Sequence, residues 1–439
     1  MICTLLPLVP STLKQIIDGM KDEYLVIRGV DKPVLNVSSF DFLGLSRNPS
    51  VKKVSKDALE KYGCGSCGPR GFYGTIDKHL AFESYISKFM GTQEAISYSD
   101  SASAISSAIP AFAKKGDLLI VDECCNEPIQ TGLNLSRATV QTFKHNDMAD
   151  LHAILQSIAE DDIRLRRDTT QQRRFIVTEG LFRSTGDICA LPDILRLKEQ
   201  FCYRLILDES LSFGTLGATG RGVTEHFQVK VTDIEMILLA MDTSLASVGG
   251  VCVGSREIVD HQRLSGAGYC FSAAGPPFLS ASAVESLHQM EQAPELLTRL
   301  QTNAVELTAA LTSLTDLQIR SKDVTPVIHL VLSPNCNVAQ DREASVIIAI
   351  VKKCLELGTG VSACKFSLIK GHPCLLPSIR ICATASLTKG QILQTVANLE
   401  NATRTVLGDL SISSCSGESK GDDSLPGVTS PIARFLMGL

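Results

Sequence analysis

Two short apolar segments, each ending in a polar loop that contains glycine, constrain the fold of this chain most strongly. The first, residues 204–214, is a buried-type strand that ends in Asp208 and a glycine turn. The second, residues 236–250, is a similar strand followed by small, polar residues and two glycines. Continuous apolar runs of this length are typical of strands inside a parallel sheet. Because ligands of open α/β sheets bind beyond the carboxyl ends of such strands, we expect both loops to border one pocket.

These loops resemble the paired motifs of the α-oxoamine synthases, pyridoxal 5'-phosphate (PLP) enzymes that join an amino acid to an acyl-CoA. The family's VDEAHSxG motif carries an aspartate that pairs with the pyridinium nitrogen, and Asp208 matches it. Its KAFGxxGG motif carries the lysine that holds PLP as a Schiff base. Counting back from the glycines at 249–250 places Thr243 at that lysine, and no lysine occurs between Lys230 and Lys322. A hydroxyl cannot form an imine, so we expect no covalently held PLP in this chain.

Three positions at which the family has histidines also differ. The histidine of VDEAHS is Leu211, and the family's DxxNHAS segment, whose histidine stacks on the pyridine ring, matches residues 122–128 with Asn126 at that position. The RxxxTAxHT segment matches residues 380–388, which keep Arg380 and place Leu387 at the histidine. The lysine and the three histidines all belong to one pocket, and the motifs around them are kept. Replacements that are confined to one pocket in this way indicate that the chain no longer has to perform catalysis. We therefore predict that this chain contributes no catalytic residue.

Three residues are candidates for contacts with the PLP of a neighbouring subunit. The glycine-rich segment 62–75 leads into the family's GTxxxHxxLE motif, whose loop walls the neighbour's site, so the resemblance places Cys67 near a partner's cofactor. Ser272 matches the FSxxLPP segment, in which a hydroxyl reaches the neighbour's phosphate. Tyr98 ends the strand before the family's phosphate-binding turn. The alternatives are a cysteine buried without a role and a serine that only forms a turn.

Asp100 lies in the turn where the family uses the N-H groups of a helix N-terminus to bind the cofactor phosphate. A carboxylate at this place opposes anion binding, which is one interpretation. The other is that Asp100 simply caps the helix. The sequence does not decide between the two.

Strands alternate with helices along most of the chain, which predicts an α/β fold with a mostly parallel sheet flanked by helices. The resemblance specifies PLP-dependent transferase fold type I, with a large domain and a smaller C-terminal α/β domain. We expect an N-terminal segment at 1–34 with a helix over 11–24, a large domain at 35–290, a small domain at 291–410 and a disordered tail at 411–439.

Composition limits the remaining functions. The net charge of -5 and the pI near 6.0 give no basic field, so we expect no nucleic-acid partner. The 15 cysteines include one CxxC, Cys64–Cys67, without a second pair, so we expect reduced thiols and no metal site. The apolar residues 1–10 are too few to span a bilayer, which needs about 20 residues, and we expect no transmembrane helix in this chain.

This chain retains the family's motifs but lacks the lysine. In this respect it resembles the non-catalytic subunit of a heterodimer within the family, in which the other, homologous subunit carries the lysine and the PLP. The resemblance implies condensation of L-serine with palmitoyl-CoA to 3-ketodihydrosphingosine, the first step of sphingolipid synthesis. It also implies the cytosolic face of the endoplasmic reticulum membrane, here by peripheral or partner-mediated attachment. A self-sufficient PLP-dependent acyl-CoA:amino acid C-acyltransferase and a regulatory scaffold without an active-site role are the alternatives.

Overall fold

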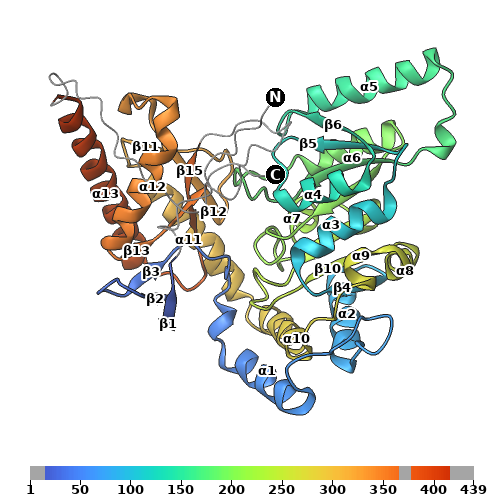
Figure 1. The fold of residues 1–439 in the computed structure, drawn as a ribbon, viewed down its shortest axis with the longest axis horizontal. Coiled ribbons are helices and arrows are strands. Elements are labelled where there is room, and N and C mark those ends of the chain that lie inside the picture. The colour runs from blue at the N-terminus through green and yellow to red at the C-terminus, as the bar shows by residue number, and fades with distance from the viewer. Residues whose placement is uncertain (1–14, 365–376, 416–439) are drawn as a thin grey trace, which may run out of the picture.

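The computed structural model describes residues 15–364 and 377–415, which form a larger and a smaller lobe (Figure 1). The larger lobe is built on a seven-stranded sheet of order β4-β10-β9-β8-β7-β5-β6. Its strands are β4 (Glu94–Tyr98), β5 (Leu118–Asp122), β6 (Thr139–Phe143), β7 (Arg174–Glu179), β8 (Arg204–Asp208), β9 (Met236–Ala240) and β10 (Gly250–Gly254). Strands β5 to β9 pair in parallel, whereas β10 is antiparallel to both β9 and β4.

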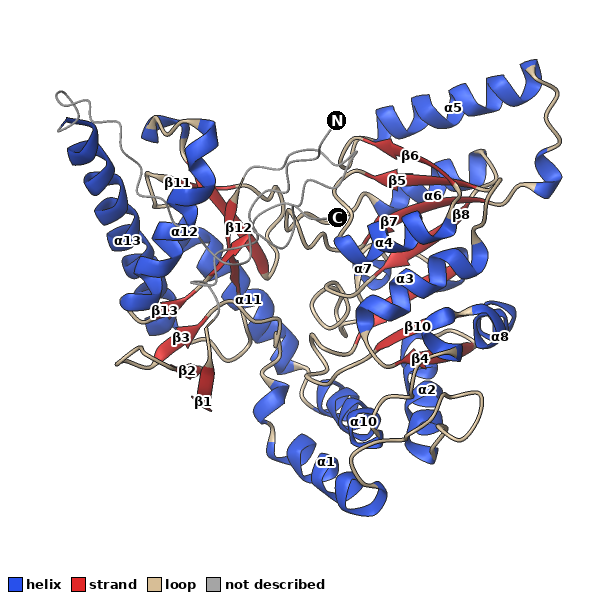
Figure 2. Cartoon of the chain, viewed as in Figure 1, coloured by secondary structure: helices blue, strands red, loops and turns tan. Residues whose placement is uncertain are grey.

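Helices cover both faces of this sheet, as the expected α/β fold requires (Figure 2). The helices of the larger lobe are α1 (Pro49–Tyr62), α2 (Asp77–Met90), α3 (Ser101–Phe112), α4 (Glu127–Ser136), α5 (Met148–Arg164), α6 (Leu191–Gln200), α7 (Val223–His226), α8 (Arg256–Ser265), α9 (Ala267–Cys270) and α10 (Pro277–Gln292), of which α1 packs on α10 and not on the sheet. The central strands are apolar along their whole length because both of their faces are buried by these helices.

The smaller lobe holds two four-stranded sheets and three long helices (Figure 1). The first sheet has the order β11-β12-β15-β14, with β11 (Leu317–Ile319), β12 (Val327–Leu332), β14 (Ser362–Cys364) and β15 (Ser378–Cys382). The second has the order β1-β2-β3-β13, with β1 (Ile17–Lys21), β2 (Tyr24–Ile27), β3 (Val34–Asn36) and β13 (Thr359–Gly360). The helices are α11 (Glu295–Leu311), α12 (Gln340–Glu356) and α13 (Lys389–Cys415).

Two cores stabilise the lobes, and α11 connects them. Leu297 and Leu300 in its first half belong to the core of the larger lobe, whereas Ala304 and Leu307 belong to that of the smaller lobe. Leu35, within β3, also packs into the smaller core, whereas Leu25, Ile27 and Val34 of the N-terminal strands form a small cluster of their own.

Two expectations about the ends of the chain need comment. The helix expected over residues 11–24 is wrong in its described part, because β1 and β2 form an antiparallel hairpin there. The tail expected from residue 411 begins inside α13, which ends at Cys415, and its remainder lies outside the described residues. In the parts of the chain that the structure describes, no helix has the length and apolar character needed to cross a membrane.

Candidate functional site

The two loops that the sequence singled out meet at the carboxyl end of the central sheet. Asp208 ends β8 and is buried, and its carboxylate accepts hydrogen bonds from the Asn126 side-chain amide and the Ser210 backbone N-H, each at 2.9 Å. Asn126 caps α4, because its side-chain oxygen also accepts the Ile129 N-H at 3.1 Å. Asn126 and Asp208 therefore lie side by side at this end of the sheet.

Thr243 lies in the second loop, beside the first. Its buried hydroxyl donates to the Ser210 carbonyl oxygen at 3.0 Å, which connects the loop after β9 to the loop after β8. Since a threonine carries no amine, this position offers a hydrogen-bond donor to the backbone and no nucleophile for a carbonyl. The side chain is satisfied by the chain itself and stabilises the pocket wall.

A second buried carboxylate, which the sequence reasoning did not single out, faces Asp208. Glu179 ends β7 directly opposite Asp208 in the parallel register. Its oxygens accept the backbone N-H groups of Asn126 at 2.7 Å and Arg183 at 3.0 Å. Burial and the neighbouring Asp208 raise the pKa of Glu179 to about 8, and burial also raises the pKa of Asp208. Glu179 stands in a segment that resembles the family's TEGxxS motif, which was the available signal.

The turn that would bind a phosphate is occupied by carboxylates of this chain. Asp100 is the N-cap of α3, and its side chain accepts the Ser103 N-H at 2.7 Å, so it caps the helix and at the same time places a carboxylate at this turn. Asp242 accepts the Ser101 hydroxyl at 3.2 Å at the same turn. Two carboxylates repel a phosphate from the donors of this helix end, and Thr243 offers no amine. The residues present therefore do not fit a PLP held by this chain alone.

The remaining positions that match the family pocket are either buried leucines or an arginine that packs on an aromatic ring. Leu211 and Leu387, which replace histidines, are buried in the two cores. Arg380 and Arg183 lie over the Phe40 ring, at 4.3 and 4.8 Å from its centroid. The retained Arg380 thus packs against an aromatic ring and also donates to the Ser38 carbonyl at 3.2 Å.

The three residues expected to contact a partner lie in one region, with different exposure. Ser272 and Tyr98 line the same small pocket, and the Tyr98 hydroxyl donates to Gln262 at 2.8 Å. Cys67 is exposed, with a backbone φ of 55°, and is not among the residues described around that pocket. Its loop is nevertheless fixed to the segment after Ser272, because the Ala274 N-H donates to the Gly68 carbonyl at 2.9 Å. The roles of these residues toward a partner's cofactor stay a prediction.

Aromatic side chains project from the same two segments. Phe72 is 75% exposed, Tyr73 95% and Phe271 88%, and we call these three residues the aromatic surface. Large exposed apolar patches mark surfaces that contact another protein, and the Gly68–Ala274 hydrogen bond holds together the two segments that carry these side chains. Beneath them, Arg70 forms a buried, bidentate ion pair with Glu83, with the closest atoms 2.7 Å apart, which fixes the loop that carries Phe72 and Tyr73.

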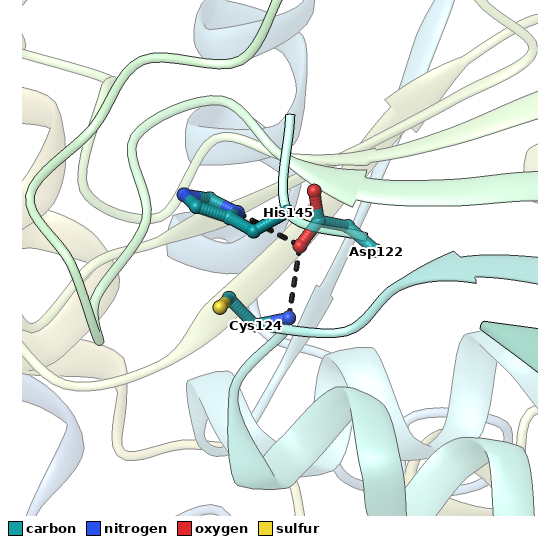
Figure 3. A group of neighbouring side chains, drawn as sticks. All are labelled: Asp122, Cys124 and His145. Carbon is teal, nitrogen blue, oxygen red and sulfur yellow. Dashed lines mark hydrogen bonds and ion pairs between the residues drawn. The ribbon is translucent and has the colours of Figure 1, made fainter. Parts of the chain in front are cut away.

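A polar cluster lies at the end of β5, beside the segment that carries Asn126. His145 lies between two carboxylates, with Nδ1 at 2.9 Å from Asp122 and Nε2 at 3.2 Å from Asp187. Burial lowers the pKa of His145, but its hydrogen bonds to Asp122 and Asp187 outweigh this effect and raise that pKa to about 12. Cys124 lies beside the ring (Figure 3). The sequence analysis did not identify this cluster.

Comparison with known proteins places the chain in one family. Residues 32–399 match the family described as aminotransferase class I and II. Serine palmitoyltransferase 1 of Dictyostelium discoideum is 42% identical over 86% of this chain and 79% of its own length. Long chain base biosynthesis protein 1c of Oryza sativa is also 42% identical, over 86% of this chain and 77% of its own length.

Solved structures agree with the fold. A serine palmitoyltransferase from Sphingomonas wittichii superposes with a TM-score of 0.79 at 25% identity, covering 89% of this chain and 92% of its own. One from S. paucimobilis, solved with a PLP adduct bound, gives a TM-score of 0.80 at 25% identity, with 90% and 93% covered. The expected PLP-dependent transferase fold is thereby confirmed. The chain belongs to the class I and II aminotransferases, and within them to the group that contains serine palmitoyltransferase 1 and long chain base biosynthesis protein 1.

Proposed function

We propose that this chain is the non-catalytic subunit of serine palmitoyltransferase. It stabilises a lysine-bearing partner, long-chain base subunit 2, and completes the partner's active site for the condensation of L-serine with palmitoyl-CoA to 3-ketodihydrosphingosine. The observation that carries this proposal is Thr243, whose hydroxyl is bound to the Ser210 carbonyl inside an otherwise retained pocket framework. A chain with the family fold and a complete core, but without an amine at this position, is suited to support catalysis by a partner and not to catalyse the reaction itself.

The aromatic surface supports the heterodimer. Subunits of a symmetric pair bury the same patch on both chains, so a homologous partner presents a matching apolar patch to Phe72, Tyr73 and Phe271. Covering these side chains removes apolar area from water, which stabilises the pair. Cys67 and Ser272 lie on the loops beside this surface, where they reach a partner's pocket once the two chains associate.

The partner holds PLP, which supplies the electron sink for carbon–carbon bond formation when it is bound. The residues of this chain then act as a wall. Ser272 donates a hydrogen bond toward the phosphate, and Cys67 excludes water from the pocket mouth. Tyr98 lines the same small pocket as Ser272 and is held in place by its hydrogen bond to Gln262. The complex works at the cytosolic face of the endoplasmic reticulum membrane, with this chain attached peripherally or through its partner.

Covalent trapping of PLP tests the proposal. The chain is incubated with PLP alone and together with its lysine-bearing partner, reduced with borohydride and mapped by peptide mass spectrometry. We expect a pyridoxyl adduct on the partner only. A Thr243→Lys variant of this chain is the matched control, and it also stays unlabelled because Asp100 and Asp242 still occupy the phosphate-binding turn. An adduct on the wild-type chain alone would instead favour the self-sufficient transferase, for which the retained Asp208 and Arg380 speak.

The scaffold alternative makes a different prediction. If this chain only stabilises its partner, Ser272→Ala and Cys67→Ser leave kcat and KM for both substrates unchanged in the purified heterodimer. If the chain completes the site, these variants change the steady-state constants or the apparent affinity for PLP while the amount of heterodimer stays constant. Size-exclusion chromatography separates a loss of assembly from a loss of activity.

A further inference from the structure

The cluster around His145 has the composition of a metal centre (Figure 3). Ligand atoms of Asp122, Cys124 and His145 all lie within 4.8 Å of one another, and Asp187 lies on the other side of the imidazole. Thiol, imidazole and carboxylate are the three donor types that proteins use for zinc. The cluster adjoins the pocket of Asp208 through the segment that carries Asn126, but the function proposed above does not use it.

Hydrogen bonds within the cluster separate ligands from supporting groups. Both oxygens of Asp122 are occupied, because they accept the His145 ring N-H, the Cys124 backbone N-H and the Asn146 backbone N-H at 2.8–2.9 Å. Asp122 therefore orients the imidazole and directs Nε2 toward Asp187. A carboxylate that holds the far nitrogen of a histidine in this way is the usual outer partner of a zinc-bound imidazole.

One pair of the remaining donors has a spacing that suits a tetrahedral ion. His145 Nε2 and Asp187 Oδ2 are 3.2 Å apart. Two ligands of a tetrahedral zinc with bonds of about 2.0 Å are about 3.3 Å apart, so this pair needs little movement to share an ion. The ligand atoms of Cys124 and His145 lie within 4.8 Å of each other. The second oxygen of Asp187 accepts the Lys322 N-H at 2.6 Å, which fixes this carboxylate as well.

Electrostatics favour a cation at this place. The side chains of Asp122, Glu123 and Asp187 contribute three carboxylates around His145, and Arg320 is the guanidinium close enough to interact with Asp187 and Cys124. Binding of Zn²⁺ releases one proton from the Cys124 thiol and one from His145 Nε2 to solvent. Two unit charges leave as one divalent ion enters, so the net charge of the buried cluster does not change.

We propose that Cys124 Sγ, His145 Nε2 and Asp187 Oδ2 form a zinc site, with water as the fourth ligand and Asp122 as the residue that orients His145. The ion would connect the ends of β5 and β6 to the loop after β7. That loop also contacts the smaller lobe, because Thr325 donates to the Gly186 carbonyl at 2.8 Å and Asp323 accepts the Ile188 N-H at 2.8 Å. The site is thus placed to stabilise the arrangement of the two lobes.

Zinc and cobalt binding to the full chain test the site. Every protein carries Cys64→Ser, so that the exposed Cys64–Cys67 pair cannot hold metal. After chelator treatment, equilibrium dialysis against Zn²⁺ should give one ion per chain, and Co²⁺ should give a thiolate charge-transfer band. Cys124→Ala should abolish the band and weaken zinc binding at least about 100-fold, and Asp122→Asn should weaken it about 10–100-fold.

The neighbouring buried thiol is the matched control. Cys125 directs its Sγ to the Val177 carbonyl at 3.8 Å, away from the cluster, so Cys125→Ala should bind zinc and cobalt as the parent does. Circular dichroism verifies the fold of each variant. Should Cys124→Ala fail to fold, the cobalt spectrum of the parent still decides. A parent without a thiolate band, or equal zinc binding by the Cys124 and Cys125 variants, would show that only hydrogen bonds hold the cluster together and would overturn the proposal.

Discussion

Truncation of Phe271 should weaken the proposed heterodimer without affecting the fold of this subunit. The side chain follows α9 and is 88% exposed in the free chain, so it contributes little to the core. In the heterodimer it is expected to lie against the partner, together with Phe72 and Tyr73. Phe271→Ala removes this contact and leaves the backbone of the segment unchanged.

The magnitude follows from the exposed area. A phenylalanine can bury roughly 170 Å², of which about 150 Å² is available here, and at ~25 cal/mol per Å² this area corresponds to about 4 kcal/mol. Alanine keeps part of the contact, and the interface covers only part of the ring. We therefore expect a loss of about 2 kcal/mol, which raises the Kd of the heterodimer about 30-fold.

The assay measures the Kd between this chain and the lysine-bearing partner by biolayer interferometry, with urea unfolding as the measure of stability. Ile163→Ala is the matched control, because Ile163 is 80% exposed on α5, which lies well away from α9 in Figure 1. Both variants should unfold within about 0.5 kcal/mol of wild type. Equal Kd values for the Phe271 variant and the control would refute the assignment of this surface to the partner.

Two further predictions concern stability. Glu83→Ala should lower the free energy of unfolding by about 3–5 kcal/mol, because it leaves the buried guanidinium of Arg70 without its carboxylate. Glu60→Ala, which removes an exposed ion pair, should change the free energy of unfolding by less than about 1 kcal/mol. Urea titration measures both values, and similar losses for the two variants would contradict the burial argument. Burial and the neighbouring Asp208 raise the pKa of Glu179 from its ordinary value of 4.5 to about 8. Between these two pH values the folded state retains a proton that the unfolded state releases. The free energy of unfolding should therefore fall as pH rises from about 4.5 to 8. Glu179→Gln should flatten this slope in urea titrations from pH 5 to 8, and an unchanged slope would show that other groups cause it.

The sequence by itself determined the central part of the pocket. Apolar strands that end in polar loops had to lie side by side in a parallel sheet, so the pattern alone places Asp208 and Thr243 at one edge of that sheet. The loss of the lysine is likewise a fact of the sequence, because it depends on a residue type and a motif, not on a distance. The same patterns predicted the α/β fold that the structural comparisons confirm.

Tertiary structure decided what local patterns leave open. The helix expected over residues 11–24 is wrong because β1 gains its backbone partners from β2, whose own pairing with β3 depends on the smaller lobe. The capping role of Asp100 could be assigned only from the position of the Ser103 N-H. The cluster of Asp122, His145 and Asp187 joins the end of β5 to two loops, and the exposure of Phe271 depends on what packs around it. Contacts between residues far apart in the chain follow from how the elements pack, and no periodicity or motif within one segment encodes that packing.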